Sequence, residues 1–170
     1  MKKITTFSKI IIFLMILFGI NQTSDAQWTK VTISGRWSIE FPSSSTTTLP
    51  GTGAWPVIIS HSSAGHPTFE VRYHKLKGKP MDLTLIDAAL DTDLRDYATE
   101  VGGTVVRTVA PHDWKKGRSM VGDIENPNQM KAKVRTFIHK GNEKFILIIH
   151  NQGSYPPVIS VERFWNSLTP

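Results

Sequence analysis

Alternating apolar and polar positions open the chain after residue 26 and predict β-strands. Residues 28–33 alternate loosely, Ser34-Gly35 favours a turn, and Trp37, Ile39 and Phe41 share one face of the next strand. These features predict an opening hairpin that Pro42 ends. Residues 42–53 consist of Ser, Thr, Pro and Gly apart from Leu49, so we expect a long loop there.

Further strand-like segments follow at short intervals, and a loop that includes residues 112–118 is expected among them. The hairpin signal Gly141-Asn142 joins two of these segments. The continuous apolar run 145–149 favours a place at the centre of a sheet, where both faces are covered. The predicted strands are residues 55–60, 68–76, 104–109, 119–125, 130–139 and 144–151.

The hydrophobic period changes to that of a helix between about residues 84 and 101. Asp82 or Thr84 is suited to cap its start, and Gly102-Gly103 provides a stop. The apolar stripe consists of Leu85, Ile86, Ala89, Leu90, Leu94, Tyr97, Ala98 and Val101. A second amphipathic helix is expected at residues 158–168, with Val161, Phe164, Trp165 and Leu168 docking on the sheet.

This order of elements leaves few connections that could make parallel crossovers. We therefore expect an α+β fold, in which helices pack on a mostly antiparallel sheet of about 7–8 strands as a sandwich. The length fits a single domain at residues 27–170.

Residues 1–26 have the layout of a secretory signal peptide. Three lysines precede an apolar run over residues 10–20, and the small-residue exit Ser24-Asp25-Ala26 follows. The run has about half of the ~20 residues that a membrane-spanning helix needs. Cleavage after Ala26 would give a periplasmic or secreted product, and an uncleaved N-terminal anchor is the alternative. With no cysteine in the chain, lipid attachment at the cut, thiol catalysis and cysteine zinc sites are excluded.

Charge and composition narrow the classes of partner. Removing residues 1–26, which carry three lysines and one aspartate, lowers the net charge from +6 to +4. This balance suits contact with anionic surfaces, but no basic stripe with interleaved aromatics points to nucleic acid. The lack of disulfides in an exported chain favours a bacterial envelope. The oligomeric state is left open.

Binding chemistry is concentrated in the segment Trp114-Lys115-Lys116-Gly117-Arg118. Three cations beside an indole could hold an anionic head group, a glycan or the acidic edge of a protein. The alternative is a solvated loop whose Trp114 folds back on the sheet. Trp55, at the end of the Ser/Thr/Pro-rich loop, is a second candidate for contact.

Catalytic and metal-binding patterns are sparse. His61 and His66 flank a predicted turn and are candidate metal ligands, with separate surface histidines as the alternative. His112-Asp113 has no identified nucleophile, and the chain has no G-x-S-x-G elbow. We therefore expect no catalytic residue and no cofactor.

The element order and several motifs resemble the PsbP-like domains, the family of the extrinsic photosystem II protein P and its exported bacterial relatives. The closing segment is similar to the terminal R-F-x-x-S-F helix of that family, with Leu168 in place of the usual aromatic. The resemblance implies an α/β/α sandwich and a noncatalytic, assembly-assisting role. The other motifs are residues 37–42, Gly102-Gly103, Lys116-Gly117-Arg118, Arg135 and Phe145.

The sequence thus predicts an exported, noncatalytic binding domain that contacts a protein or an envelope component. A secreted hydrolase with an unrecognised site and a carrier of a small ligand are the alternatives.

Overall fold

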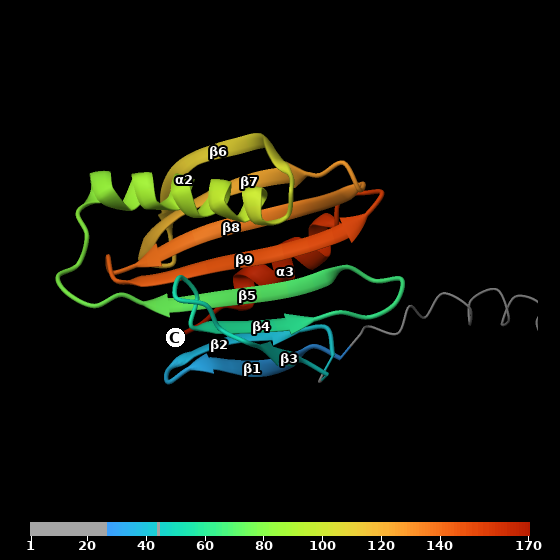
Figure 1. Cartoon of the computed structure of the whole chain (residues 1–170). Helices are drawn as coiled ribbons and strands as arrows, with labels where there is room; N and C mark the ends of the chain where they lie inside the picture. The colour runs from blue at the N-terminus through green and yellow to red at the C-terminus, as the bar shows by residue number, and fades with distance from the viewer. Residues whose placement is uncertain (1–26, 44) are drawn as a thin grey trace, which may run out of the picture.

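A seven-stranded antiparallel sheet forms the centre of the protein, in the order β3-β4-β5-β9-β8-β7-β6 (Figure 1). The computed structural model describes residues 27–43 and 45–170, so the predicted signal peptide lies outside the described residues. The strands of this sheet are β3 (Thr47–Leu49), β4 (Val57–His61), β5 (Thr68–Lys75), β6 (Thr104–Trp114), β7 (Gly117–Glu125), β8 (Met130–His139) and β9 (Glu143–Gln152). A separate two-stranded hairpin consists of β1 (Thr29–Ser34) and β2 (Trp37–Phe41).

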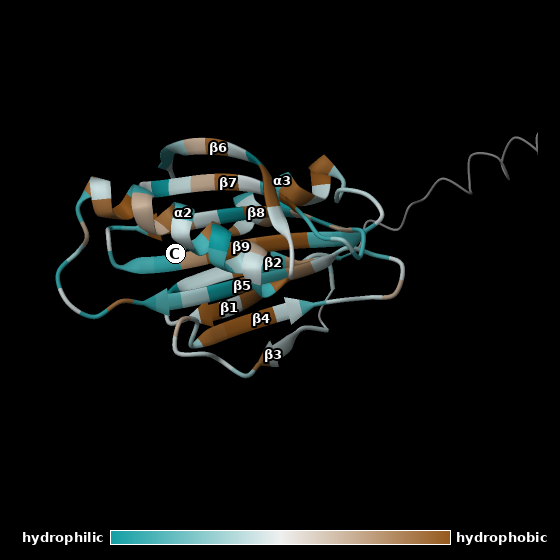
Figure 2. Cartoon of the chain, turned by 45° about the horizontal axis from the view of Figure 1, so that its top comes forward, coloured by the Kyte–Doolittle hydropathy of each residue, from teal (hydrophilic) through white to brown (hydrophobic). Residues whose placement is uncertain are grey.

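Each face of the large sheet carries its own layer. Helix α2 (Leu83–Glu100) covers one face, and helix α3 (Val158–Ser167) with the β1–β2 hairpin covers the other. Strand β9 lies at the centre, and Figure 2 colours much of it as hydrophobic. Its odd residues from Phe145 to Ile149 face the α3 layer, and Ile146 and Ile148 face α2. The continuous apolar run is therefore explained by burial on both sides.

The opening hairpin packs as its alternation predicts. Trp37, Ile39 and Phe41 are buried, with the Trp37 ring 4.7 Å from that of Phe145 and the Phe41 ring 5.4 Å from that of Phe164 in α3. A bridge between Ser38 and Thr169 then joins the hairpin to the end of the chain. Strand β2 and α3 thus close one layer together.

Helix α2 begins and ends close to its predicted bounds. Of the two candidate caps, the Asp82 side chain accepts the hydrogen bond from the Leu85 N–H at 3.0 Å. Leu90 and Leu94 are fully buried against the sheet. Gly122 in β7 makes room for this contact, since a Cβ there would lie 2.6 Å from a Leu94 methyl carbon. Leu85, which the periodicity placed in the stripe, is exposed instead.

Two predicted loops are partly strand. Residues 47–49 form β3 at one edge of the sheet, paired with β4. At the other edge, β6 continues to Trp114 and β7 starts at Gly117, so Lys115-Lys116 alone makes the turn. Irregularities in the β6–β7 register interrupt the alternation of residues 104–114, and an edge strand has one unpaired side. The sequence pattern is therefore weak in both places.

Among the described residues, no helix has the length and apolar character needed to cross a membrane.

Candidate binding surfaces at the two ends of the sheet

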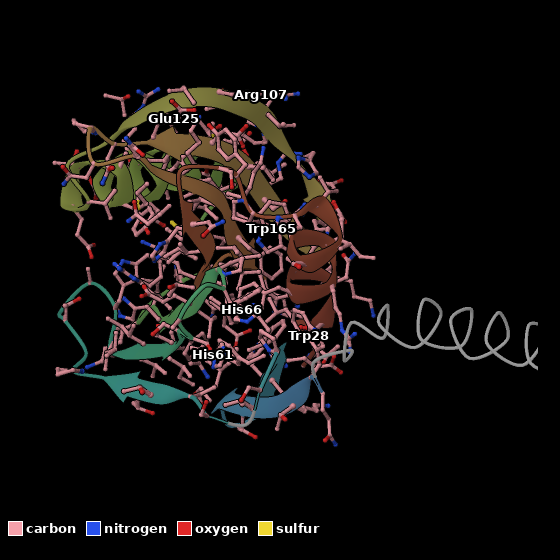
Figure 3. All side chains as sticks on the ribbon, turned by 90° about the vertical axis from the view of Figure 1, so that its right-hand side faces the viewer. Trp28, His61, His66, Arg107, Glu125 and Trp165 are labelled. Carbon is pink, nitrogen blue, oxygen red and sulfur yellow. The ribbon has the colours of Figure 1, made fainter. Side chains whose placement is uncertain are left out.

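The polar candidates of the chain gather at opposite ends of the sheet. At one end, the β6–β7 and β8–β9 turns are neighbours because Gly117 pairs with His139. The β5–α2 connection joins them through a hydrogen bond from the Met81 N–H to the Gly141 carbonyl at 2.9 Å. The other end holds the β4–β5 loop and the start of α3, together with His61, His66 and Trp28 (Figure 3).

Trp114 folds back on the sheet. Its ring contacts that of Phe137 edge-on, with centroids 4.8 Å apart. The Arg135 guanidinium lies between two indoles, 4.4 Å from the Trp114 ring and 4.6 Å from that of Trp165. Burial lowers the pKa of Arg135, which has no carboxylate within ion-pair distance among the described residues. These contacts give Trp114 a packing role and correspond to the alternative that the sequence left open.

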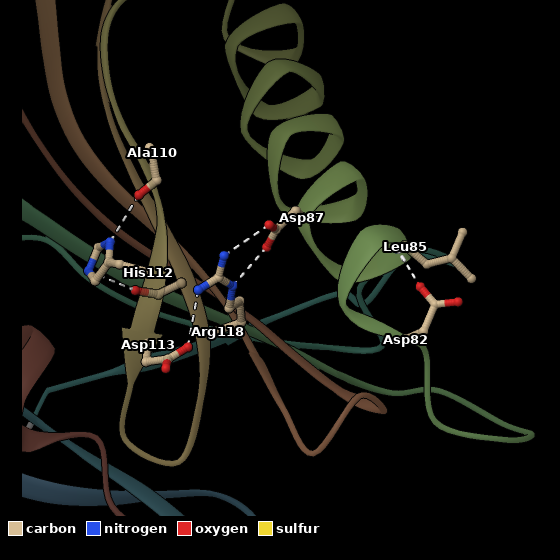
Figure 4. Close-up of polar contacts among 8 residues, drawn as sticks. Asp82, Leu85, Asp87, Ala110, His112, Asp113 and Arg118 are labelled. Carbon is tan, nitrogen blue, oxygen red and sulfur yellow. Dashed lines mark hydrogen bonds and ion pairs between the residues drawn. The ribbon is translucent and has the colours of Figure 1, made fainter.

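Two of the three predicted cations have internal partners. The Lys115 ammonium donates to the carbonyls of Asn166 and Leu168 at 2.6 Å each, where it caps the C-terminus of α3. Burial lowers the pKa of Lys115. Arg118 binds both carboxylate oxygens of Asp87 in α2, at 2.9 and 3.0 Å, and one oxygen of Asp113 at 3.1 Å (Figure 4). The hydrogen bonds that Arg118 donates to Asp87 and Asp113 raise the pKa of Arg118.

Lys116 differs from its neighbours, because its exposed side chain has neither a hydrogen bond nor an ion pair among the described residues. Its φ is +59° and that of Lys115 is +47°, as in the type I′ turns that usually carry Asn-Gly. Lys140, in the adjacent β8–β9 turn, has a φ of +49°. For residues other than glycine, this left-handed backbone conformation is unfavourable by roughly 1–2 kcal/mol.

Lys116 belongs to a group of exposed lysines that sequence reasoning did not assemble. None of the group has an ion pair among the residues that the structure describes. Three nearby carboxylates, those of Asp87, Asp113 and Glu143, have cationic partners, and a fourth, Asp82, caps α2. Lys116 and Lys140 line an open hollow of about 850 Å³ beside Leu83, and Leu83 and Leu85 are exposed. We call this surface the basic end: Lys75, Lys77, Lys79, Lys116, Lys140, Leu83 and Leu85. The K-x-K-x-K spacing of residues 75–79 is the feature of the sequence that could have indicated this cluster of lysines.

Trp55 lies apart from the basic end and is buried in the α2 core. The Lys144 ammonium lies 5.1 Å from its ring centroid and 2.8 Å from an Asp93 oxygen. The indole therefore packs beneath a partly buried ion pair, which is a structural role.

His61 and His66 line a cleft of about 460 Å³ at the opposite end. His61 is 5% exposed, and its Nδ1 lies 2.7 Å from the Ser45 carbonyl, whereas His66 is exposed. No group of three metal-binding side chains is present in the described part of the chain. A third histidine, His74, does not line this cleft, and its Nδ1 lies 2.9 Å from the Ala54 carbonyl oxygen. Two imidazoles alone are fewer ligands than a zinc site normally uses.

The other histidine candidate, His112, lies beside Ser119 rather than in a triad. The Ser119 hydroxyl is 3.3 Å from His112 Nε2, but Ser119 is fully buried and no substrate carbonyl could reach it. Asp113 binds Arg118 instead of orienting the imidazole (Figure 4). This arrangement lacks the exposed nucleophile that a serine hydrolase requires.

Comparisons with known proteins give a fold but no sequence relative. A scan of family models and a search of curated proteins each return no match. The solution structure of cyanobacterial PsbP (CyanoP) from Synechocystis sp. PCC 6803 is similar, with a TM-score of 0.59 and 8% sequence identity. The alignment covers 88% of this chain and 95% of that chain. The resemblance noted in the sequence is thereby confirmed at the level of architecture: the protein has a PsbP-like α+β fold.

Proposed function

We propose that this protein is an exported, noncatalytic binding domain that contacts an acidic surface of a protein or envelope component through its basic end. The observation that carries the proposal is the set of exposed lysines around Leu83 and Leu85, without ion-pair partners among the described residues. Such a surface attracts an acidic partner by its field and offers apolar area for contact. A noncatalytic role also agrees with the PsbP-like fold.

The backbone at the turns supports the same surface. Glycine or asparagine would fit residues 115, 116 and 140 with less strain than lysine does. The contacts of Lys115 with α3 explain one of the three, whereas the side chains of Lys116 and Lys140 make no hydrogen bond or ion pair with the residues that the structure describes. Strained residues of this kind often serve a function outside the folding of their own chain.

A charge-reversal experiment tests the proposal. The full-length gene is expressed, the exported protein is purified, and chemical cross-linking in envelope extract is followed by mass spectrometry. We expect cross-links at Lys75, Lys77 and Lys79, which all the variants retain. These cross-links should fall by about tenfold in the double variant Lys116→Glu/Lys140→Glu, because like charges would oppose binding. The matched control is Lys30→Glu/Arg107→Glu, which makes the same change in net charge at exposed residues elsewhere. Equal loss in both variants would show that net charge alone matters and would contradict the proposal.

Glycine variants separate binding from stability. Lys116→Gly should relieve the left-handed backbone and raise the free energy of unfolding by about 0.5–1 kcal/mol, yet weaken binding. Gln129→Gly is the matched control, because Gln129 has a φ of +63° in the β7–β8 turn at the far end of the sheet. It should stabilise similarly and leave binding unchanged. Unchanged binding in Lys116→Gly would remove Lys116 from the contact.

The export step of the proposal has its own measurement. Residues 1–26 lead to a cut after Ala26, so the mature chain should begin with Gln27. Intact mass and N-terminal sequencing of the exported protein would identify this product. A chain that retains residues 1–26 in the membrane fraction would instead support the N-terminal anchor.

A further inference from the structure

The cleft that contains His61 has the size and lining of a small-molecule site and shares no residue with the basic end. Its volume of about 460 Å³ falls within the usual range for ligand pockets, roughly 300–1,000 Å³. Four stretches of chain build it: Trp28, the residues after β2, the β4–β5 loop and the first turns of α3 (Figure 3).

The charge of the cleft favours an anion. Its described lining includes one permanent cation, Arg163, and no aspartate or glutamate. The Arg163 guanidinium lies 4.6 Å from the Trp28 ring, which holds it at the rim, and its nearest carboxylate, Glu40, is 3.9 Å away.

The first turn of α3 adds to this potential. Its N-cap, Pro157, makes no side-chain cap, and the first turn contains no acidic residue. Ile159 and Ser160 of this turn line the cleft. The positive end of the helix dipole therefore lies at the cleft without a neutralising side chain of its own.

His61 supplies the second, independent feature. The Ser45 carbonyl can only accept a hydrogen bond, so His61 Nδ1 must be the protonated donor at 2.7 Å. The other nitrogen, Nε2, has no partner among the described residues and is not one of the buried unpaired atoms, so it is open to solvent. In the neutral ring, this atom accepts a hydrogen bond. A side chain that is 95% buried thus presents one acceptor to the cleft.

Hydroxyl groups complete the lining. Ser43, Ser45, Ser62, Ser63 and Ser160 can donate as well as accept hydrogen bonds. Phe69, Pro42 and Pro67 add apolar wall. This mixture of an acceptor, several hydroxyls and a cation fits a ligand that has hydroxyl groups and a negative charge in one molecule.

We propose that the cleft binds a small hydroxylated organic anion, such as a sugar phosphate or a hydroxy-carboxylate. The anionic group lies against Arg163 and the start of α3, and a ligand hydroxyl donates to His61 Nε2. This site is additional to the proposed contact at the basic end and does not depend on it.

Isothermal titration calorimetry of the exported protein tests the site with four probes: glucose 6-phosphate, glucose, inorganic phosphate and zinc chloride. Glucose 6-phosphate should bind at least about tenfold more tightly than glucose or phosphate, because only it satisfies both halves of the site. Equal affinity for inorganic phosphate would indicate an adventitious ion only. Binding of zinc without binding of glucose 6-phosphate would assign His61 and His66 to a metal. Either result would overturn the proposal, as would no binding of any probe.

A helix-terminus variant distinguishes a ligand site from a structural effect. Ser160→Asp places a carboxylate in the first turn of α3, which favours the helix but repels an anion in the cleft. We expect unchanged or higher thermal stability and at least about tenfold weaker binding of glucose 6-phosphate. The matched control, Thr84→Asp, makes the same change in the first turn of α2, which also lacks an acidic residue. Binding that survives Ser160→Asp, or falls equally in both variants, would contradict the site.

Discussion

The two ends of the sheet differ in how they use positive charge. At the basic end, exposed lysines of two hairpin turns and of the β5–α2 connection lie near exposed leucines of α2, where the surface is broad and open. At the cleft end, one arginine, two histidines and a helix terminus surround a hollow with many hydroxyls. The first arrangement suits a large acidic partner, and the second suits a small anion that can be enclosed. One PsbP-like fold thus carries two separate candidate binding surfaces.

The ends also differ in how helix α2 is anchored between them. Near the start of α2, Asp87 binds Arg118, which is partly open to solvent. Near its end, Glu100 binds Arg72, a buried side chain that also pairs with Glu70. Burial alone would lower the pKa of Arg72, but the hydrogen bonds that Arg72 donates to Glu100 and Glu70, and the negative charges of these two residues, raise it overall. Removing one partner of a buried ion pair costs more than removing one partner of a solvated pair, because the remaining charge is left without a counterion or water.

The largest expected effect comes from Arg72. Arg72→Met should lower the free energy of unfolding by about 3 kcal/mol, because it leaves the Glu70 carboxylate buried without its cation. Arg118→Met, the matched change at the other anchor, should cost much less because water can replace the lost partner. Urea unfolding of both variants measures the difference. Similar losses would show that the two anchors are equivalent.

A middle-sized effect is expected for Trp114. Trp114→Ala should lower the free energy of unfolding by about 2 kcal/mol, because it removes the contact with Phe137 and one of the indoles that enclose Arg135. The cross-linking pattern of the folded fraction should remain that of the wild type, since the indole packs inward. A variant that is fully stable but no longer binds would return Trp114 to the contact surface that its sequence suggests.

The smallest expected effect is on the pH dependence of stability, through His150 at the cleft end of β9. Burial lowers the pKa of His150, partly offset by Glu70, so the unfolded chain takes up a proton at this residue more readily than the folded chain. Stability contributed by the neutral ring is therefore present above about pH 6.5 and declines as the pH falls below that value. Urea unfolding at pH 7.5 and 5.5 should show a smaller drop for His150→Gln than for the wild type. An identical drop would mean that His150 makes no contribution.

Local sequence signals predicted most of the architecture. The alternation in residues 37–41, the helical period after residue 84 and the apolar run 145–149 each correspond to an observed element. The predictions were wrong at residues 47–49 and 110–114, where strands form on the two edges of the sheet. Edge strands pair on one side and are largely exposed, so their sequences show little alternation. The α+β class was nevertheless predictable, because it depends on the order of elements more than on their bounds.

The candidate sites were predicted less well, for a different reason. The sequence pointed to the segment around Lys116 but gave equal weight to each of its three cations. Arg118 binds Asp87, which lies 31 positions earlier in the chain. Lys115 donates hydrogen bonds to backbone carbonyls 51 and 53 positions later. The cleft joins stretches of chain that no local motif connects. Sequence spacing could not show which charges would remain free.

The sequence by itself determined the strand and helix periods, the composition of the core and the predicted export signal, because these depend on neighbouring residues along the chain. Only the tertiary structure decided which lysines form the basic end and which serine, histidine and arginine side chains surround the cleft. The physical reason is that an ionic or polar group is satisfied by whatever lies within hydrogen-bond distance in space. That neighbour is set by the sheet order and by the packing of both helices.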